Sequence, residues 1–163
     1  KPYLEGCGQF LIHNVDIISD LDIRWMASQT RRDAMATLLV SDRVTSRYLL
    51  FDPDTMRLKG WTNVVTGEVR SPYPELAVTQ CRRLAFSGIH IMSDTVFAAL
   101  EDFVSRQGLD PEHPRFPIMD FYLSACALYE IYGVEADGLH LVDVGKLDTL
   151  EIAEKEISRV SQN

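Results

Sequence analysis

Hydrophobic and polar positions in the first forty residues predict a strand, a helix and a second strand. Residues 9–13 form a short apolar run after a turn-rich segment, which is typical of a strand buried on both faces. Ser19 and Asp22 resemble a capping box. The residues that follow at helical spacing are Ile23, Met26, Ala27 and Thr30. Residues 35–40 form the next apolar run, and this βαβ order favours a parallel sheet.

The middle of the chain predicts a β-hairpin. Residues 48–51 and 58–61 are strand-like and flank Asp52-Pro53-Asp54, which is a turn signal. Residues 63–74 contain one glycine and two prolines and are expected to form a loop. The hairpin is therefore expected beside the main sheet.

A further strand and two helices are expected after the hairpin. Residues 84–92 are strand-like, and Ser93-Asp94 would cap a helix that ends at Gly108. Residues 119–129 are apolar almost all round, which indicates a helix covered on most sides.

The last part of the chain predicts two short strands and a final helix. Residues 132–136 and 139–142 surround Asp137-Gly138, the strongest short hairpin signal in the chain. A helix is expected from Asp148. The alternation of strands and helices predicts one α/β domain over residues 1–163, with a mostly parallel sheet flanked by helices.

Composition and charge exclude several classes of protein. The 46% hydrophobic and 25% charged residues are close to globular averages, and no tract of low complexity interrupts them. The net charge is −8 and the basic residues are scattered, so we expect no nucleic-acid partner. No apolar run approaches the ~18 residues of a membrane helix, and no signal segment opens the chain. We therefore expect a cytoplasmic protein without a membrane partner.

Three cysteines and four histidines are present, but none of them shows metal-ligand spacing. Two aspartates are better candidates for chemistry, because ligand sites of α/β sheets lie at the carboxyl ends of strands. Asp16 and Asp143 each follow an apolar run, 127 positions apart. Mg²⁺ is commonly held by one or two carboxylates together with substrate phosphate oxygens. The alternative is that each aspartate caps the helix after it.

Four segments resemble motifs of the sugar-phosphate nucleotidyltransferases, in particular of enzymes similar to mannose-1-phosphate guanylyltransferase. They occur in the family's order between residues 9 and 156. The segments are residues 10–17 with Asp20-Leu21-Asp22, residues 85–89, residues 116–120 and residues 142–146. The resemblance implies a Rossmann-like sheet and an enzyme that makes a nucleotide-sugar and pyrophosphate from NTP and a sugar 1-phosphate.

The resemblance also implies roles for individual residues. Asp16 and Asp143 would be catalytic and would hold Mg²⁺ between the phosphates of the two substrates. Five residues would bind substrate, namely Asn14, Ser87, Gly88, Asp120 and Lys146. Four of the five also have a structural alternative: a bulge for the glycine, a turn for the asparagine, a helix start for the aspartate and a solvated surface position for the lysine.

The chain also departs from the family. It has no glycine-rich loop for the triphosphate, and Trp61-Thr62-Asn63 stands about where many members have Glu-Lys-Pro. The resemblance therefore implies the carboxyl-terminal portion of an enzyme, which we expect to be inactive by itself. The alternative is a non-catalytic subunit that binds a nucleotide-sugar. The sequence does not identify the sugar substrate: mannose, N-acetylmuramate and heptose phosphates are all candidates, and resemblance alone favours mannose as the sugar and guanine as the base. The oligomeric state is not determined either, and a homo-oligomer is one possibility.

Overall fold

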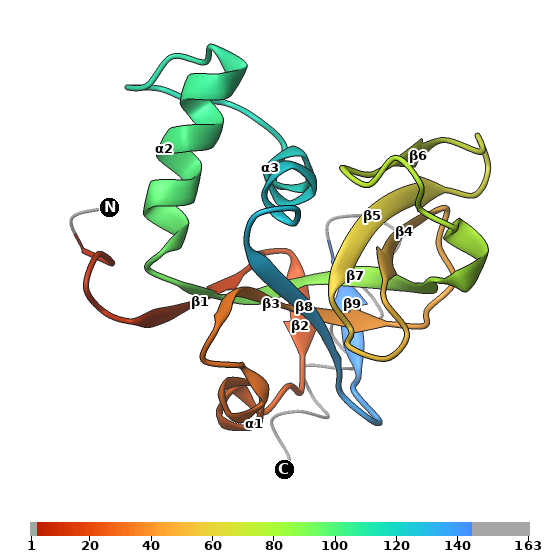
Figure 1. Cartoon of the computed structure of the whole chain (residues 1–163). Helices are drawn as coiled ribbons and strands as arrows, with labels where there is room; N and C mark the ends of the chain where they lie inside the picture. Colours follow the sequence, from red (N-terminus) through yellow and green to blue (C-terminus); the bar gives the residue numbers. More distant parts are fainter. Residues whose placement is uncertain (1–2, 145–163) are drawn as a thin grey trace.

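The computed structural model describes residues 3–144, which form a seven-stranded mixed sheet, a two-stranded sheet and three α-helices (Figure 1). The elements are β1 (Gln9–His13), β2 (Ile17–Ser19), α1 (Ile23–Gln29), β3 (Ala34–Ser41), β4 (Arg47–Phe51), β5 (Leu58–Asn63), β6 (Val69–Arg70), a 3₁₀ turn (Val78–Gln80), β7 (Arg82–Ser93), α2 (Val96–Gln107), α3 (Ile118–Ala125), β8 (Glu130–Glu135) and β9 (Leu141–Asp143). The large sheet has the order β6-β5-β4-β7-β3-β8, and β1 also pairs with β7.

The α/β class is confirmed, but the expected mostly parallel sheet is wrong. Among the strand pairs of residues 3–144, only β3 and β8 run parallel. The predicted βαβ unit does not place β1 beside β3, because the long strand β7 lies between them and is antiparallel to both. The hydrophobic pattern predicts that a segment is a strand, but it does not say which strand becomes its neighbour.

The first strand and the first helix differ in detail from their sequence patterns. The ends of β1 are exposed and its middle is half-buried, because within the described chain it pairs only with β7. The carboxylate of Asp22 caps α1 by accepting hydrogen bonds from the backbone N–H groups of Arg24 and Trp25, at 2.8 and 3.2 Å. Ser19 belongs to β2 instead, so the expected capping box is wrong.

The predicted hairpin is confirmed as β4 and β5, and its turn folds back onto β8. The backbone N–H of Gly133 donates to Met56 O at 2.9 Å, and Arg57 forms an ion pair with Glu130 at 2.9 Å. The ring of Phe51 packs against Gly133, where an added Cβ would lie 2.9 Å from Cε1. These contacts join the hairpin turn to a strand at the far edge of the same sheet, so the sheet is curled (Figure 1).

The second predicted hairpin is wrong. The Asp137-Gly138 turn is present and Gly138 has a φ of +69°, but the strands on either side of it belong to different sheets. β8 lies parallel beside β3, whereas β9 pairs antiparallel with β2. The turn therefore sends the chain from the large sheet to the small one.

The helices cover both faces of the large sheet. α2 ends at Gln107 and is capped by Gly108, as predicted, with a φ of +62°, whereas Thr95 stands at its start instead of the expected Ser93-Asp94 cap. α2 packs with α3 on one face against Leu38 and Met92. α3 ends at Ala125, earlier than expected. α1 covers the other face through Met26, which packs on Leu39, Ile89 and Ile91 (Figure 1). The expected helix from Asp148 lies outside the described residues. Within residues 3–144, no helix has the length and apolar character needed to cross a membrane.

Candidate functional site

A gap in the strand pairing of β7 marks the candidate site. β4 pairs with β7 residues 82–84 and β1 pairs with residues 89–93 along the same edge. Residues 85–88 therefore have no strand partner on this edge within the described chain. On the opposite edge the register shifts between Leu38 and Val40 of β3, so one β3 residue faces three residues of β7. Such bulges re-aim side chains and are common beside active sites.

Asn14 and Gly88, both predicted to bind substrate, are in contact at this gap. The backbone N–H of Asn14 donates to Gly88 O at 3.0 Å. Gly88 has a φ of +77°, and an added Cβ would lie 2.9 Å from Asn14 Nδ2 and 3.2 Å from Ile17 Cγ1. Only glycine fits this backbone without strain or displacement. Gly88 therefore lies in a bulge and also makes a close contact with another residue.

Ser87 contributes a buried hydroxyl next to this contact. Its side chain is 2% exposed, and its Oγ has no hydrogen-bond partner among the described residues. A buried hydroxyl without a partner costs about 1–3 kcal/mol of folding free energy. Such a cost is often retained where a bound molecule or a water supplies the missing partner.

The fold also brings Asp16 and Asp143 to adjoining positions. Ile17 is the pairing partner of Asp143, and the backbone N–H of Val144 donates to Asp16 O at 2.8 Å. Asp143 ends β9 as predicted, whereas Asp16 lies in the turn between β1 and β2 instead of ending a strand. Asp16 is not a helix cap, because β2 separates it from α1 and Asp22 caps that helix. The two aspartates, 127 positions apart in sequence, therefore lie at the same end of this short pairing.

Asp16 and Asp143 each carry a carboxylate, the ligand type that an oxygen-seeking divalent ion combines with ligands from its substrate. Residues 3–144 contain no group of three or more His, Cys, Asp or Glu side chains that could hold a metal by themselves. Mg²⁺ does not need one, since it keeps several waters and is often held by one or two carboxylates and phosphate oxygens. Asp16 is half-buried and Asp143 is exposed, so both positions border solvent.

The other two predicted substrate contacts are placed differently. Asp120 lies in the first turn of α3, and its Oδ1 is 2.7 Å from Nη2 of Arg70 on β6. This ion pair gives the carboxylate a structural partner, and a sugar contact by Asp120 stays a prediction. Lys146 lies outside the described residues.

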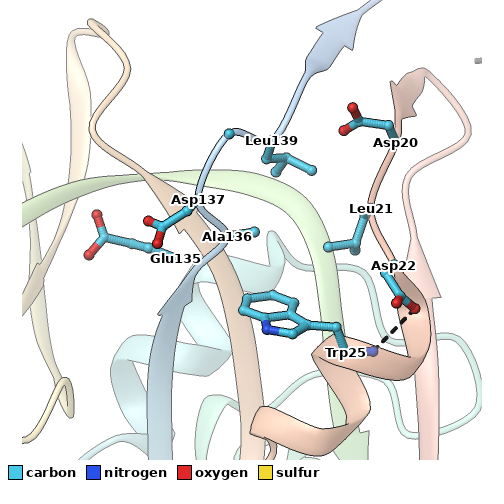
Figure 2. A pocket seen from close by; sticks show the side chains of 9 residues that line it. Asp20, Leu21, Asp22, Trp25, Glu135, Ala136, Asp137 and Leu139 are labelled. Atoms are coloured by element: carbon cyan, nitrogen blue, oxygen red, sulfur yellow. Dashed lines mark hydrogen bonds between the residues drawn. The ribbon is translucent and has the colours of Figure 1, made fainter.

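A cavity of about 400 Å³ lies at the opposite end of the β2–β9 pair, and acidic residues line it around Trp25 (Figure 2). Most of these carboxylates have structural partners. Asp20 Oδ1 accepts from the backbone N–H of His140 at 2.9 Å, Asp22 caps α1, and Glu135 pairs with Arg82 at 2.6 Å. We therefore do not take this cavity as the candidate site.

The sequence pattern missed one feature of the candidate site, the arginines of the loop between β3 and β4. Arg43 Nη2 donates to Phe86 O at 3.0 Å, so its guanidinium lies on the unpaired stretch of β7. Arg47 begins β4 beside it. Single arginines scattered through a sequence form no motif, and only the pairing of β4 with β7 brings these two to the site.

Comparisons with known proteins show the fold. No protein-family model matches the chain, and no curated protein sequence matches it significantly. Among solved structures, the inositol-1-phosphate CTP transferase from T. maritima matches with a TM-score of 0.64 and 12% sequence identity. The match covers 99% of this chain and 59% of that chain. The chain thus shares the fold of this transferase and spans somewhat more than half of its length.

Proposed function

We propose that this chain belongs to a nucleotidyltransferase that forms a nucleotide-sugar and pyrophosphate from NTP and a sugar 1-phosphate. One observation carries the proposal: the backbones of Asp16 and Asp143 lie at the same end of the β2–β9 pair, and Ile17, next to Asp16, lies against Gly88 beside Asn14. The fold shared with a CTP transferase supports the same reaction class. The four resembling segments, which contain these residues, add the support of the sequence.

In this proposal Asp16 and Asp143 bind Mg²⁺ together with phosphate oxygens of the substrates. The bound ion would screen the repulsion between two anionic substrates and stabilise charge at the α-phosphorus. Asn14 and the buried hydroxyl of Ser87 provide polar groups for the sugar, and Gly88 leaves room for it to approach the backbone.

The chemistry asks little of these side chains beyond positioning. An oxygen of the sugar phosphate attacks the α-phosphorus of NTP in line, a new P–O bond forms, and the bond to pyrophosphate breaks. The attacking phosphate is already ionised, so no side chain has to remove a proton. Alignment and electrostatic stabilisation then account for most of the rate enhancement.

The decisive experiment replaces each aspartate in the complete gene product and measures pyrophosphate release. Asp16→Asn and Asp143→Asn should each lower Mg²⁺-dependent turnover by at least about 100-fold, because metal stabilisation of the transition state is worth several kcal/mol. Both changes keep the size of the side chain, so thermal unfolding should change little. Asp137→Asn is the matched control, since it removes the same charge from the acidic cavity of Figure 2.

If Asp16→Asn or Asp143→Asn turns over as fast as the unchanged protein, the replaced aspartate is not a ligand of the metal. A large loss in Asp137→Asn alone would move the site to the acidic cavity. The substrates are found by testing the four common NTPs against a panel of sugar 1-phosphates that includes mannose, N-acetylmuramate and heptose forms, together with inositol 1-phosphate. Tight binding of a nucleotide-sugar without any turnover would instead support a non-catalytic subunit.

A further inference from the structure

A small cavity of about 210 Å³ adjoins the unpaired stretch of β7. Its lining includes Arg43, Thr45, Arg47, Trp61, Phe86 and Met119. Pockets that enclose a whole drug-sized ligand measure about 300–1,000 Å³, so this cavity suits one part of a larger ligand. Phe86 is two residues before Gly88 on the same strand, so the guanidinium of Arg43 and the backbone N–H of Asn14 bind carbonyls of the same short stretch of β7.

The cavity is positively charged in a protein whose net charge is −8. No acidic residue lines it within the described chain, and Arg47 has no ion-pair partner among the described residues. Arg43 uses one of its five N–H donors on Phe86 O and keeps the others for a ligand. The carboxylate nearest in sequence to the lining residue Met119 is Asp120, which Arg70 already neutralises.

Hydrogen bonds hold the part of the arginine loop that leads into β4. The backbone N–H of Thr45 donates to the hydroxyl of Tyr48 at 3.0 Å, and the backbone N–H of Val64 donates to Ser46 O at 2.9 Å. Positions held by such bonds bind a ligand at a lower cost in conformational entropy. Trp61 adds a half-buried aromatic surface on β5.

The spacing of this cavity from the metal end of the site suggests its ligand. Phe86 and Gly88 are two residues apart on β7, so their Cα atoms lie at most about 7 Å apart, and less where the strand bulges. A sugar whose 1-phosphate lies near Asp16 and Asp143 and whose ring lies at Gly88 would place a remote substituent at the arginines. We propose that Arg43 and Arg47 bind a second anionic group of the sugar, a carboxylate or a phosphate, remote from the reacting phosphate. This inference rests on the proposed function and specifies its substrate class.

The test compares sugar 1-phosphates that differ by one anionic group, using the complete gene product. The carboxylate arm pairs glucose 1-phosphate with glucuronate 1-phosphate, and N-acetylglucosamine with N-acetylmuramate 1-phosphate. The phosphate arm pairs glucose and mannose 1-phosphates with their 1,6-bisphosphates. In one arm we expect kcat/KM for the anionic member to exceed that of the neutral member by about 10- to 100-fold, the usual range for a charged hydrogen-bonded contact.

Arg47→Gln should remove this preference, because it lowers kcat/KM for the anionic member of a pair by a larger factor than for the neutral member. Arg115→Gln, on an exposed loop, is the matched control and should keep the preference. The inference is overturned when no pair shows a preference, or when Arg47→Gln lowers both members of a pair equally, since the arginines would then serve the reacting phosphate or the fold.

A binding measurement separates this inference from the proposed function. Trp25→Phe leaves Trp61 as the sole tryptophan, so its fluorescence reports on the cavity. Titration with the anionic sugar 1-phosphates should change this fluorescence, and Arg47→Gln should weaken the apparent affinity about 10-fold or more. Binding lost in Arg47→Gln supports the subsite even if no pyrophosphate is ever released. Binding that Arg47→Gln leaves unchanged overturns it, whatever the turnover.

Discussion

Gly88 combines a positive φ with a close neighbour, and the two constraints can be measured separately. An alanine at a φ of +77° is strained by about 1–2 kcal/mol, and its Cβ would also press on Asn14. Gly67→Ala, at a φ of +74° with nothing within 4 Å of the added Cβ, carries only the backbone strain. We expect Gly88→Ala to lower the free energy of unfolding in urea by about 1–3 kcal/mol more than Gly67→Ala does.

Adding Asn14→Ala to Gly88→Ala should recover part of this excess, because it removes the atoms nearest to the new Cβ. Equal losses in Gly67→Ala and Gly88→Ala would show that the contact with Asn14 is loose.

His90 is a buried histidine whose ring nitrogens have no hydrogen-bond partner among the described residues. The ring is stacked on Phe86 and meets the edge of Tyr122, and burial lowers the pKa of His90 from 6.5 to about 4. The unfolded chain therefore takes up a proton near pH 6.5, while folded His90 stays neutral until about pH 4. Its stabilising contribution is complete above pH 6.5 and falls by about 3 kcal/mol between pH 6.5 and 4.

The free energy of unfolding, measured in urea from pH 7 to 4, checks this expectation. His90→Phe should flatten the acid side of the curve, whereas the exposed His113→Gln should leave its slope unchanged. An identical slope in His90→Phe and in the unchanged protein would assign the acid sensitivity to other groups.

At the scale of elements, the closure of the β4–β5 hairpin onto β8 depends on Gly133. The ring of Phe51 is fully buried, and a Cβ at Gly133 would lie 2.9 and 3.0 Å from its Cε1 and Cζ atoms. Gly133→Ala should therefore lower the free energy of unfolding by about 1–3 kcal/mol, measured by denaturant titration. Phe51→Leu should compensate, so the double variant should be more stable than the two single losses predict, by at least about 0.5 kcal/mol. Strict additivity would show that the hairpin turn moves away at little cost.

At the scale of the whole molecule, local patterns predicted most elements but not their neighbours. The strands at 9–13 and 84–92, the first hairpin and the helix ending at Gly108 follow from period, turn and cap signals, and the structure contains them. The prediction of a mostly parallel sheet was wrong, because the twelve-residue strand β7, which follows the hairpin, lies between β1 and β3 and is antiparallel to both. Pairing between distant segments is decided by tertiary packing, on which a local pattern carries no information.

The residues of the candidate site also differ in whether a local sequence pattern predicts them. Asp16, Asp143, Asn14 and Gly88 stand out in the sequence because they follow or interrupt apolar runs, and the structure places them together. Arg43 and Arg47 carry no such signal. They reach the site because β3 and β4 lie on opposite edges of β7, so the loop between them has to cross that strand.

The pairing of β2 with β9 can form only late in translation of this region. The ribosome completes β2 early and β9 last among the described strands, with 127 positions between Asp16 and Asp143. At a translation rate of about 5–20 residues per second, Asp143 is added to the chain about 6–25 s after Asp16. Until then β2 lacks the partner strand that the structure gives it, so the proposed metal pair of Asp16 and Asp143 is complete only when translation of this region finishes.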